Sequence, residues 1–204
     1  MALKEIRQID SCTRLGLWEI SESVEQFLEL KVLSVYKNKV YADLGSESRR
    51  LEFLAVRALL YHMVGDDVAI LYDNKGCPSL SNGWNISISH TKGFAVIIVS
   101  EANNVAVDIE YISERVRRVK SKFIRQDETA DKLEELLVCW CAKETLYKFF
   151  SKDDLDFCDI RISYSNIERD SHGELIAENL KRKVSSTIYY EINGLYALTY
   201  TSSL

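Results

Sequence analysis

The stretch NNVAVDIEYI, residues 103–112, predicts a β-strand in which two carboxylates interrupt a run of apolar residues. Side chains alternate between the two faces of a strand, so Asp108 and Glu110 share one face while the valines and isoleucines between them share the other. Two like charges on one face repel each other unless the face is solvated or a cation lies between them. The choice depends on which other residues the chain brings to this face.

The composition is that of a globular protein: 204 residues, of which 47% are hydrophobic and 28% are charged. A formal net charge of −5 argues against general affinity for nucleic acid. No apolar run is long enough to span a membrane and no charged-then-apolar leader is visible, so we expect a cytoplasmic protein without membrane contacts. The five cysteines are irregularly spaced and form neither a disulfide framework nor a metal-binding knuckle.

The order of the predicted elements occurs twice along the chain. We therefore expect an α+β protein built from two similar halves, residues 1–102 and 103–204, related by a pseudo-twofold axis, with a ligand site in the cleft between them. Both helices carry a basic residue, Arg57 or Lys143, followed three positions later by Leu-Tyr. The predicted elements are a helix over 48–64, a strand over 67–72 and a hairpin over 84–100 turning at Lys92-Gly93, then a helix over 132–150, a strand over 157–164 and a hairpin over 185–202 turning at Asn193-Gly194.

The second predicted helix carries Glu144 and Lys148 one turn apart on the same side. They are either a surface ion pair, or Glu144 joins Asp108 and Glu110 in a set of carboxylate ligands. Three hard oxygen ligands favour Mg²⁺ over zinc. Because protein-bound Mg²⁺ commonly also contacts phosphate, the second interpretation predicts phosphate-binding residues elsewhere in the chain.

Two segments of the first half carry residues suited to an anion. Ser89 and His90 precede the predicted turn at Lys92-Gly93, where a hydroxyl, an imidazole and backbone N–H groups can face a phosphate. Arg49, Arg50 and Arg57 lie on the predicted helix over 48–64, and arginine suits bidentate phosphate binding.

Five short motifs occur in a fixed order between residues 48 and 150, and together they resemble the signature of the surfactin-type 4′-phosphopantetheinyl transferases. The resemblance implies a cytoplasmic, Mg²⁺-dependent enzyme that transfers phosphopantetheine from coenzyme A to a serine of an apo acyl or peptidyl carrier protein, releasing 3′,5′-ADP. It also implies a pseudo-twofold pair of halves. The motifs are GCP (76–78), SISHT (87–91), VAVDIE (105–110), FIRQDE (123–128) and WCAKETLYK (140–148).

The resemblance assigns roles to individual residues. Asp108, Glu110 and Glu144 would hold Mg²⁺. Glu128 would act as the base or orient a metal-bound water, and Lys148 would contact the pyrophosphate, whereas Lys143 would be structural. The residues implied to contact coenzyme A are Ser89 and His90 at its phosphates, Arg49 or Arg50 at the 3′-phosphate, Gly76, Cys77 and Pro78 against the adenine, and Arg57, which could instead only orient its helix.

The sequence also departs from the family pattern. Ala106 stands where the family has glycine, Cys77 replaces a lysine and Thr91 replaces a serine. The first change could hinder close backbone approach and the second removes a cation from a phosphate-rich site. An alternative interpretation is therefore a non-catalytic relative that binds coenzyme A or a partner protein.

The segment ERVRRVKSKF, residues 114–123, predicts a basic amphipathic helix. It could bind nucleic acid, which the acidic chain disfavours, or it could be a solvated face. A third interpretation is that it docks an acidic carrier protein next to Glu128.

Overall fold

The computed structural model describes residues 3–65 and 67–203. The chain divides into two compact units, Met1–Asn103 and Asn104–Leu204, and the boundary lies one residue from the predicted division. Each unit combines antiparallel strands with helices and contains its own hydrophobic core. The expected α+β class is therefore confirmed, whereas the pseudo-twofold axis and the cleft stay predictions.

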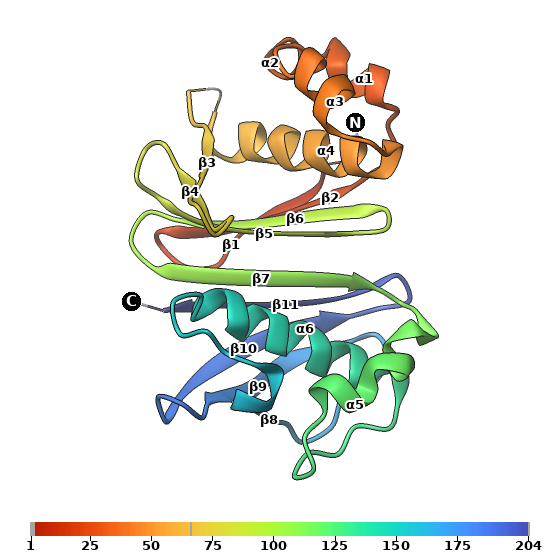
Figure 1. Ribbon diagram of the computed structural model, residues 1–204, viewed down its shortest axis with the longest axis vertical. Helices are drawn as coiled ribbons and strands as arrows, with labels where there is room; N and C mark the ends of the chain where they lie inside the picture. Colours follow the sequence, from red (N-terminus) through yellow and green to blue (C-terminus); the bar gives the residue numbers. More distant parts are fainter. Residues whose placement is uncertain (1–2, 66, 204) are drawn as a thin grey trace. The chain divides into compact units, whose positions relative to one another are not determined.

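The first unit is built on a four-stranded antiparallel sheet of order β1-β2-β6-β5. Helix α4 (Glu47–Val64) lies across one face of this sheet and packs on β2 and β6 (Figure 1). The hairpin β5–β6 turns at Lys92-Gly93 as predicted, and Gly93 has φ +83°, a conformation that favours glycine. The strands are β1 (Leu3–Gln8), β2 (Thr13–Glu19), β5 (Asn85–Thr91) and β6 (Phe94–Ser100).

Helix α4 is fixed at both ends and along its buried face. The Ser46 hydroxyl accepts a hydrogen bond from the backbone N–H of Arg49 and so caps the first turn. Gly65 ends the helix with φ +93°. In the middle, Leu59 and Met63 pack so closely on β2 that a Cβ at Gly16 would lie 2.5 Å from the Met63 sulfur. Glycine at position 16 therefore allows the helix to approach the sheet.

Three short helices and a small hairpin complete the first unit. They are α1 (Val24–Glu29), α2 (Lys31–Ser34), α3 (Lys37–Asp43), and the strands β3 (Ile70–Tyr72) and β4 (Pro78–Leu80). The strand predicted over 67–72 is thus shorter than expected, because only its last three residues pair with β4.

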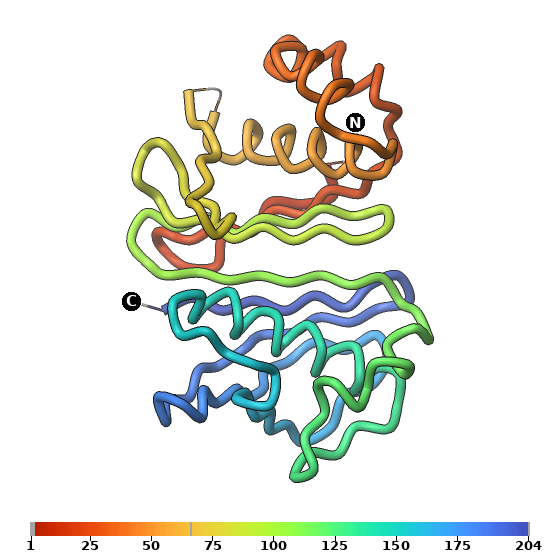
Figure 2. Tube along the Cα trace, in the orientation of Figure 1, coloured from red at the N-terminus to blue at the C-terminus, as the bar shows by residue number. Residues whose placement is uncertain are grey.

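The second unit is built on a five-stranded antiparallel sheet of order β7-β11-β10-β9-β8. Strand β11 returns to lie beside β7, as the trace in Figure 2 shows. Helix α6 (Leu133–Phe149) packs mainly on these two strands. The strands are β7 (Asn104–Tyr111), β8 (Ile160–Ser163), β9 (Ser171–Asn179), β10 (Val184–Ile192) and β11 (Tyr196–Ser203).

The remaining elements of the second unit show where the sequence predictions succeed and where they fail. The basic segment is helical as predicted, with a 3₁₀ turn η1 (Glu114–Val119) that runs into α5 (Lys120–Phe123). The strand predicted over 157–164 is wrong in its first part, because η2 (Phe157–Asp159) is a 3₁₀ turn and β8 begins at Ile160. Within the described residues, no helix combines the length and the apolar composition needed to cross a membrane.

Candidate functional site

The predicted metal ligands lie where β7 faces α6. Asp108 pairs with Thr199 across β7 and β11, so their side chains share a face of the sheet. The Thr199 hydroxyl lies 2.6 Å from the hydroxyl of Thr145 on α6, so this face is the one that the helix covers. Glu110, two residues further along β7, shares it, and Asp108 is buried whereas Glu110 is half-buried.

Lys148 on α6 binds directly to β7. Its Nζ lies 2.7 Å from Asp108 Oδ1 and donates a hydrogen bond to the Val107 carbonyl at 3.0 Å. The ion pair that Lys148 forms is therefore with the strand carboxylate and not with Glu144 on its own helix. The interpretation of Glu144 and Lys148 as a surface pair does not describe this helix.

Glu144 lies close to the carboxylates of β7. Burial, followed by repulsion from Asp108, raises the pKa of Glu144 from 4.5 to about 7, and Glu110 adds to the rise while Lys148 opposes it. The same two strand carboxylates, with burial as the main cause, raise the pKa of the buried Cys141 thiol one turn earlier on α6. Glu144, Asp108 and Glu110 therefore interact electrostatically.

The donor set fits a hard divalent cation by its chemistry. Like charges that lie close together are stabilised by a cation among them, and Mg²⁺ prefers oxygen ligands. Across residues 3–65 and 67–203, however, no three His, Cys, Asp or Glu side chains are gathered tightly enough to hold a metal ion. In this arrangement the ammonium group of Lys148 forms an ion pair with one carboxylate oxygen of Asp108.

Glu128, the predicted base, belongs to a second buried network. Its Oε2 lies 2.7 Å from Lys143 Nζ and accepts a hydrogen bond from the Arg125 backbone N–H, while its Oε1 accepts one from the Ile162 backbone N–H. The Lys143 side chain is fully buried and that of Glu128 is 5% exposed. Lys143 Nζ also donates to the carbonyl oxygens of Phe123 at 2.6 Å and Ile160 at 2.9 Å.

The two networks lie on different sides of α6. At about 100° per residue, Glu144 and Lys148 are turned roughly 100° to 140° around the helix axis from Lys143. The structure therefore brings Asp108, Glu110, Glu144 and Lys148 together and places Glu128 with Lys143 instead. Lys143 is bound by Glu128 and by backbone carbonyls, away from the carboxylates of β7.

In the first unit, His90 lies beside the N-terminal part of α4. Its Nδ1 is 3.3 Å from Glu52 Oε2, and Ser48 donates a hydrogen bond to the other oxygen of Glu52. Strand alternation places Ser89 on the opposite face of the sheet, where it is buried. Ser89 and His90 therefore do not converge on one point, although they are neighbours in the sequence.

The three arginines of α4 have different surroundings. Arg49 is exposed and lies one turn before Glu52, whereas Arg50 is held by a hydrogen bond from its Nε to the Leu44 carbonyl at 2.8 Å. Arg57, two turns further along α4, stacks on Phe53 and lies apart from this group.

The segment expected to face adenine is a tight turn closed by an aspartate. Asp73 Oδ1 accepts hydrogen bonds from the backbone N–H groups of Lys75 and Cys77, both at 2.8 Å, and Gly76 has φ +81°. Cys77 is exposed. Lys75 lies in the same turn, so a cation stands two residues from the position where the family has lysine.

Sequence reasoning missed one residue of these networks, Glu52. Glu52 was not singled out because its partner His90 is distant in the sequence, although Glu52 and Ser48 have the spacing of one helical turn. No protein-family model matches the chain, and no curated protein is similar to it at a significant level.

Proposed function

We propose that the protein transfers the 4′-phosphopantetheine group of coenzyme A to a serine hydroxyl of an apo carrier protein, releasing 3′,5′-ADP. The observation that supports this proposal best is the electrostatic coupling of Glu144 on α6 with Asp108 and Glu110 on β7. These are the residues that the family motifs name as metal ligands, and they come from two motifs that are separate in the sequence.

In this proposal Asp108, Glu110 and Glu144 hold Mg²⁺. When bound, the ion would neutralise the pyrophosphate of coenzyme A and orient its β-phosphate for attack. Lys148 lies within reach of the same carboxylates, so its ammonium group supplies positive charge to the leaving 3′,5′-ADP. Burial of Asp108 and of the neighbouring α6 surface strengthens both interactions, because charges attract more strongly away from water.

The assignment of Glu128 as the base stays a prediction. Its Oε2 accepts hydrogen bonds from Lys143 and Arg125 and its Oε1 accepts one from Ile162, and these donors, above all the Lys143 ammonium group, weaken the carboxylate as a base. In its present position Glu128 orders the loop between α5 and α6.

The first unit contributes coenzyme A contacts in the proposal. Arg49 or Arg50 would bind the 3′-phosphate and His90 would bind a phosphate of coenzyme A, and Glu52 would then have to release His90. The turn closed by Asp73 would support the adenine through Gly76 and Pro78, and Lys75 supplies a nearby cation.

The proposal is tested by mixing the protein with coenzyme A, Mg²⁺ and an apo carrier protein and measuring the carrier's mass. We expect one phosphopantetheine to be added per carrier serine. Glu144→Gln should slow transfer by about 10- to 100-fold, the scale of damage to a metal site. Glu174→Gln, which changes an exposed carboxylate of the same unit, is the matched control and should not slow transfer.

The alternative function is a non-catalytic protein that binds coenzyme A or a partner. It predicts that calorimetry detects coenzyme A binding while no mass is added to any carrier. That combination of results would contradict the transferase proposal. Equal transfer rates for the parent and Glu144→Gln at limiting Mg²⁺ would contradict the ligand assignment.

A further inference from the structure

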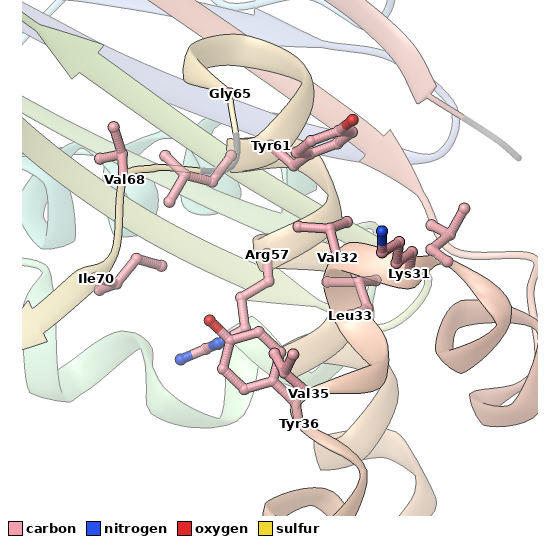
Figure 3. A pocket seen from close by; sticks show the side chains of 12 residues that line it. Lys31, Val32, Leu33, Val35, Tyr36, Arg57, Tyr61, Gly65, Val68 and Ile70 are labelled. Atoms are coloured by element: carbon pink, nitrogen blue, oxygen red, sulfur yellow. The ribbon is translucent and has the colours of Figure 1, made fainter.

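A pocket of about 450 Å³ lies within the first unit, between α2, the C-terminal half of α4 and β3 (Figure 3). Much of its wall is aliphatic and comes from Val32, Leu33, Leu60, Val68 and Ile70. A volume of this size is within the range that accommodates small organic molecules.

Arg57 gives this pocket a half-buried positive charge. Its side chain lies next to Tyr36 at one end of the pocket (Figure 3). The guanidinium is 3.3 Å from the centre of the Phe53 ring and donates a hydrogen bond to the Phe53 carbonyl at 3.0 Å. The hydroxyl groups of Tyr36 and Tyr72 lie near it, and burial lowers the pKa of Arg57. Arginine nevertheless stays charged in a protein.

The charge of Arg57 has no anionic partner within the part of the chain that the structure describes. Within residues 3–65 and 67–203, its partners are the Phe53 carbonyl, the rings of Phe53 and Tyr36, and the hydroxyl groups of Tyr36 and Tyr72, all of them uncharged. A cation that is partly removed from water is stabilised by a counter-charge beside it. An anion entering the pocket would supply that counter-charge.

We propose that this pocket binds a small monocarboxylate with an apolar body, of the chemical class of a medium-chain fatty acid. The aliphatic walls match the body, and the planar guanidinium matches the two oxygens of a carboxylate. A single negative charge balances Arg57, whereas a doubly charged phosphate would leave excess charge away from water. Lys31 also lines the pocket but is exposed, so its charge is solvated.

This site is distinct from the proposed coenzyme A contacts of the same helix. Arg57 is eight positions after Arg49, which corresponds to about 12 Å along the axis of α4. The proposal replaces the role of coenzyme A contact that the family resemblance gave to Arg57, and it does not depend on the transfer reaction.

The test is isothermal titration calorimetry of the whole chain with decanoate as the probe. We expect one decanoate to bind per chain, at least about tenfold more tightly than decan-1-ol, which has the same tail without the charge, and than butyrate, which has the charge without the tail. Arg57→Gln should weaken decanoate binding by about tenfold or more.

Arg14→Gln is the matched control. Arg14 also donates to a backbone carbonyl, that of Met63 at 2.6 Å, and also lies over an aromatic ring, that of Trp84, but it does not line the pocket. Decanoate should bind to this variant as it does to the parent. Where circular dichroism shows that Arg57→Gln is unfolded, Val68→Trp provides the same test, because it fills the pocket and leaves the cation in place.

Several results would overturn the proposal. They are the absence of decanoate binding to the parent, equal affinity for decanoate and decan-1-ol, and undiminished binding to Arg57→Gln or Val68→Trp. Competitive displacement of decanoate by coenzyme A would also overturn it, because the pocket would then belong to the coenzyme A site. The result is independent of the transfer assay, since an inactive protein gives the same calorimetric answer.

Discussion

Arg57 on α4 and Lys143 on α6 hold the same position relative to the Leu-Tyr pair of their helices, yet the two units compensate their charges differently. Lys143 is fully buried and meets Glu128 at 2.7 Å, with backbone carbonyls around it. Arg57 meets two aromatic rings and one carbonyl. The second unit therefore supplies the counter-charge from its own chain, and the first leaves that role to a ligand.

The carboxylates of β7 and α6 form the converse case. Burial and the charges of Asp108 and Glu110 raise the pKa of Glu144 to about 7, although Lys148 is nearby. The pair of Glu128 and Lys143 thus has matched charges. The surroundings of Arg57 favour an added anion, and the carboxylates of β7 and α6 favour an added cation. Sites of the latter two kinds are where ligands are expected.

The largest effect is expected for Lys143→Met. The change leaves the Glu128 carboxylate buried without its cation, so it should lower the free energy of unfolding by about 3–5 kcal/mol. Urea denaturation followed by circular dichroism measures this loss.

The double variant Lys143→Met with Glu128→Gln is the control, because it removes both charges and should regain part of the lost stability. Glu128→Gln alone is not a clean test of a catalytic base. An amide has one acceptor oxygen, whereas both oxygens of Glu128 accept hydrogen bonds from backbone N–H groups. If the double variant is less stable than Lys143→Met, the two residues do not act as a compensated pair.

The next effect concerns pH and Glu144. In protein free of divalent cations, folding raises the pKa of Glu144 from 4.5 to about 7, so the folded state binds a proton that the unfolded chain releases. This contribution to stability is present below about pH 4.5 and is lost as the pH rises through about 7. Urea midpoints measured across this range should fall more steeply for the parent than for Glu144→Gln.

Repeating these urea titrations with added Mg²⁺ tests whether the carboxylates hold the ion. If the carboxylates hold the ion, Mg²⁺ should remove most of the difference between the parent's midpoints at the two ends of the pH range, because the ion favours ionised ligands. Identical pH profiles for the parent and Glu144→Gln, with or without Mg²⁺, would show that Glu144 is not coupled to its neighbours.

A smaller effect is expected for Arg57→Gln in the ligand-free protein. The change removes a hydrogen bond and a ring contact of a half-buried side chain, so the loss should be about 1 kcal/mol or less. Decanoate should raise the melting temperature of the parent and not that of the variant. A loss as large as that of Lys143→Met would show that both helices depend on their cations equally.

The smallest effect on stability is expected at exposed charges. Arg118 and Lys122 lie exposed on η1 and α5, whereas Arg117 is held by Glu114 and by the Asp131 carbonyl. Changing Arg118 and Lys122 to Glu should alter the free energy of unfolding by less than about 0.5 kcal/mol.

The same double variant tests carrier docking. It should raise the KM for the carrier protein and flatten the salt dependence of kcat/KM. Lys152→Glu, an exposed charge outside η1 and α5, is the control. An unchanged KM at low salt would mean that this face is only solvated.

The sequence predicted the elements whose patterns are local. Strand β7 follows from strict alternation, α4 and α6 from helical spacing, and the two main hairpins from their glycine turns. Strands β1 and β2 were missed because they are ordered by pairing with each other and with β6, whose residues lie far along the chain.

The candidate site was predictable to the extent that its contacts run along one helix or one strand. The shared face of Asp108 and Glu110 follows from alternation, and the nearness of Glu144 to Lys148 from one helical turn. The pairing of Glu128 with Lys143 could not be predicted, because it depends on the path of the loop between α5 and α6. The same holds for His90 and Glu52, which belong to different elements.

The carboxylate of Glu128 also affects the local unfolding of the second unit. It accepts the backbone N–H of Arg125, in the loop before α6, and the backbone N–H of Ile162, in β8. Because one side chain protects both amides, they should exchange their hydrogens with solvent in a single cooperative event. The loop and the edge strand therefore form one unit of local unfolding, although they are distant in the sequence.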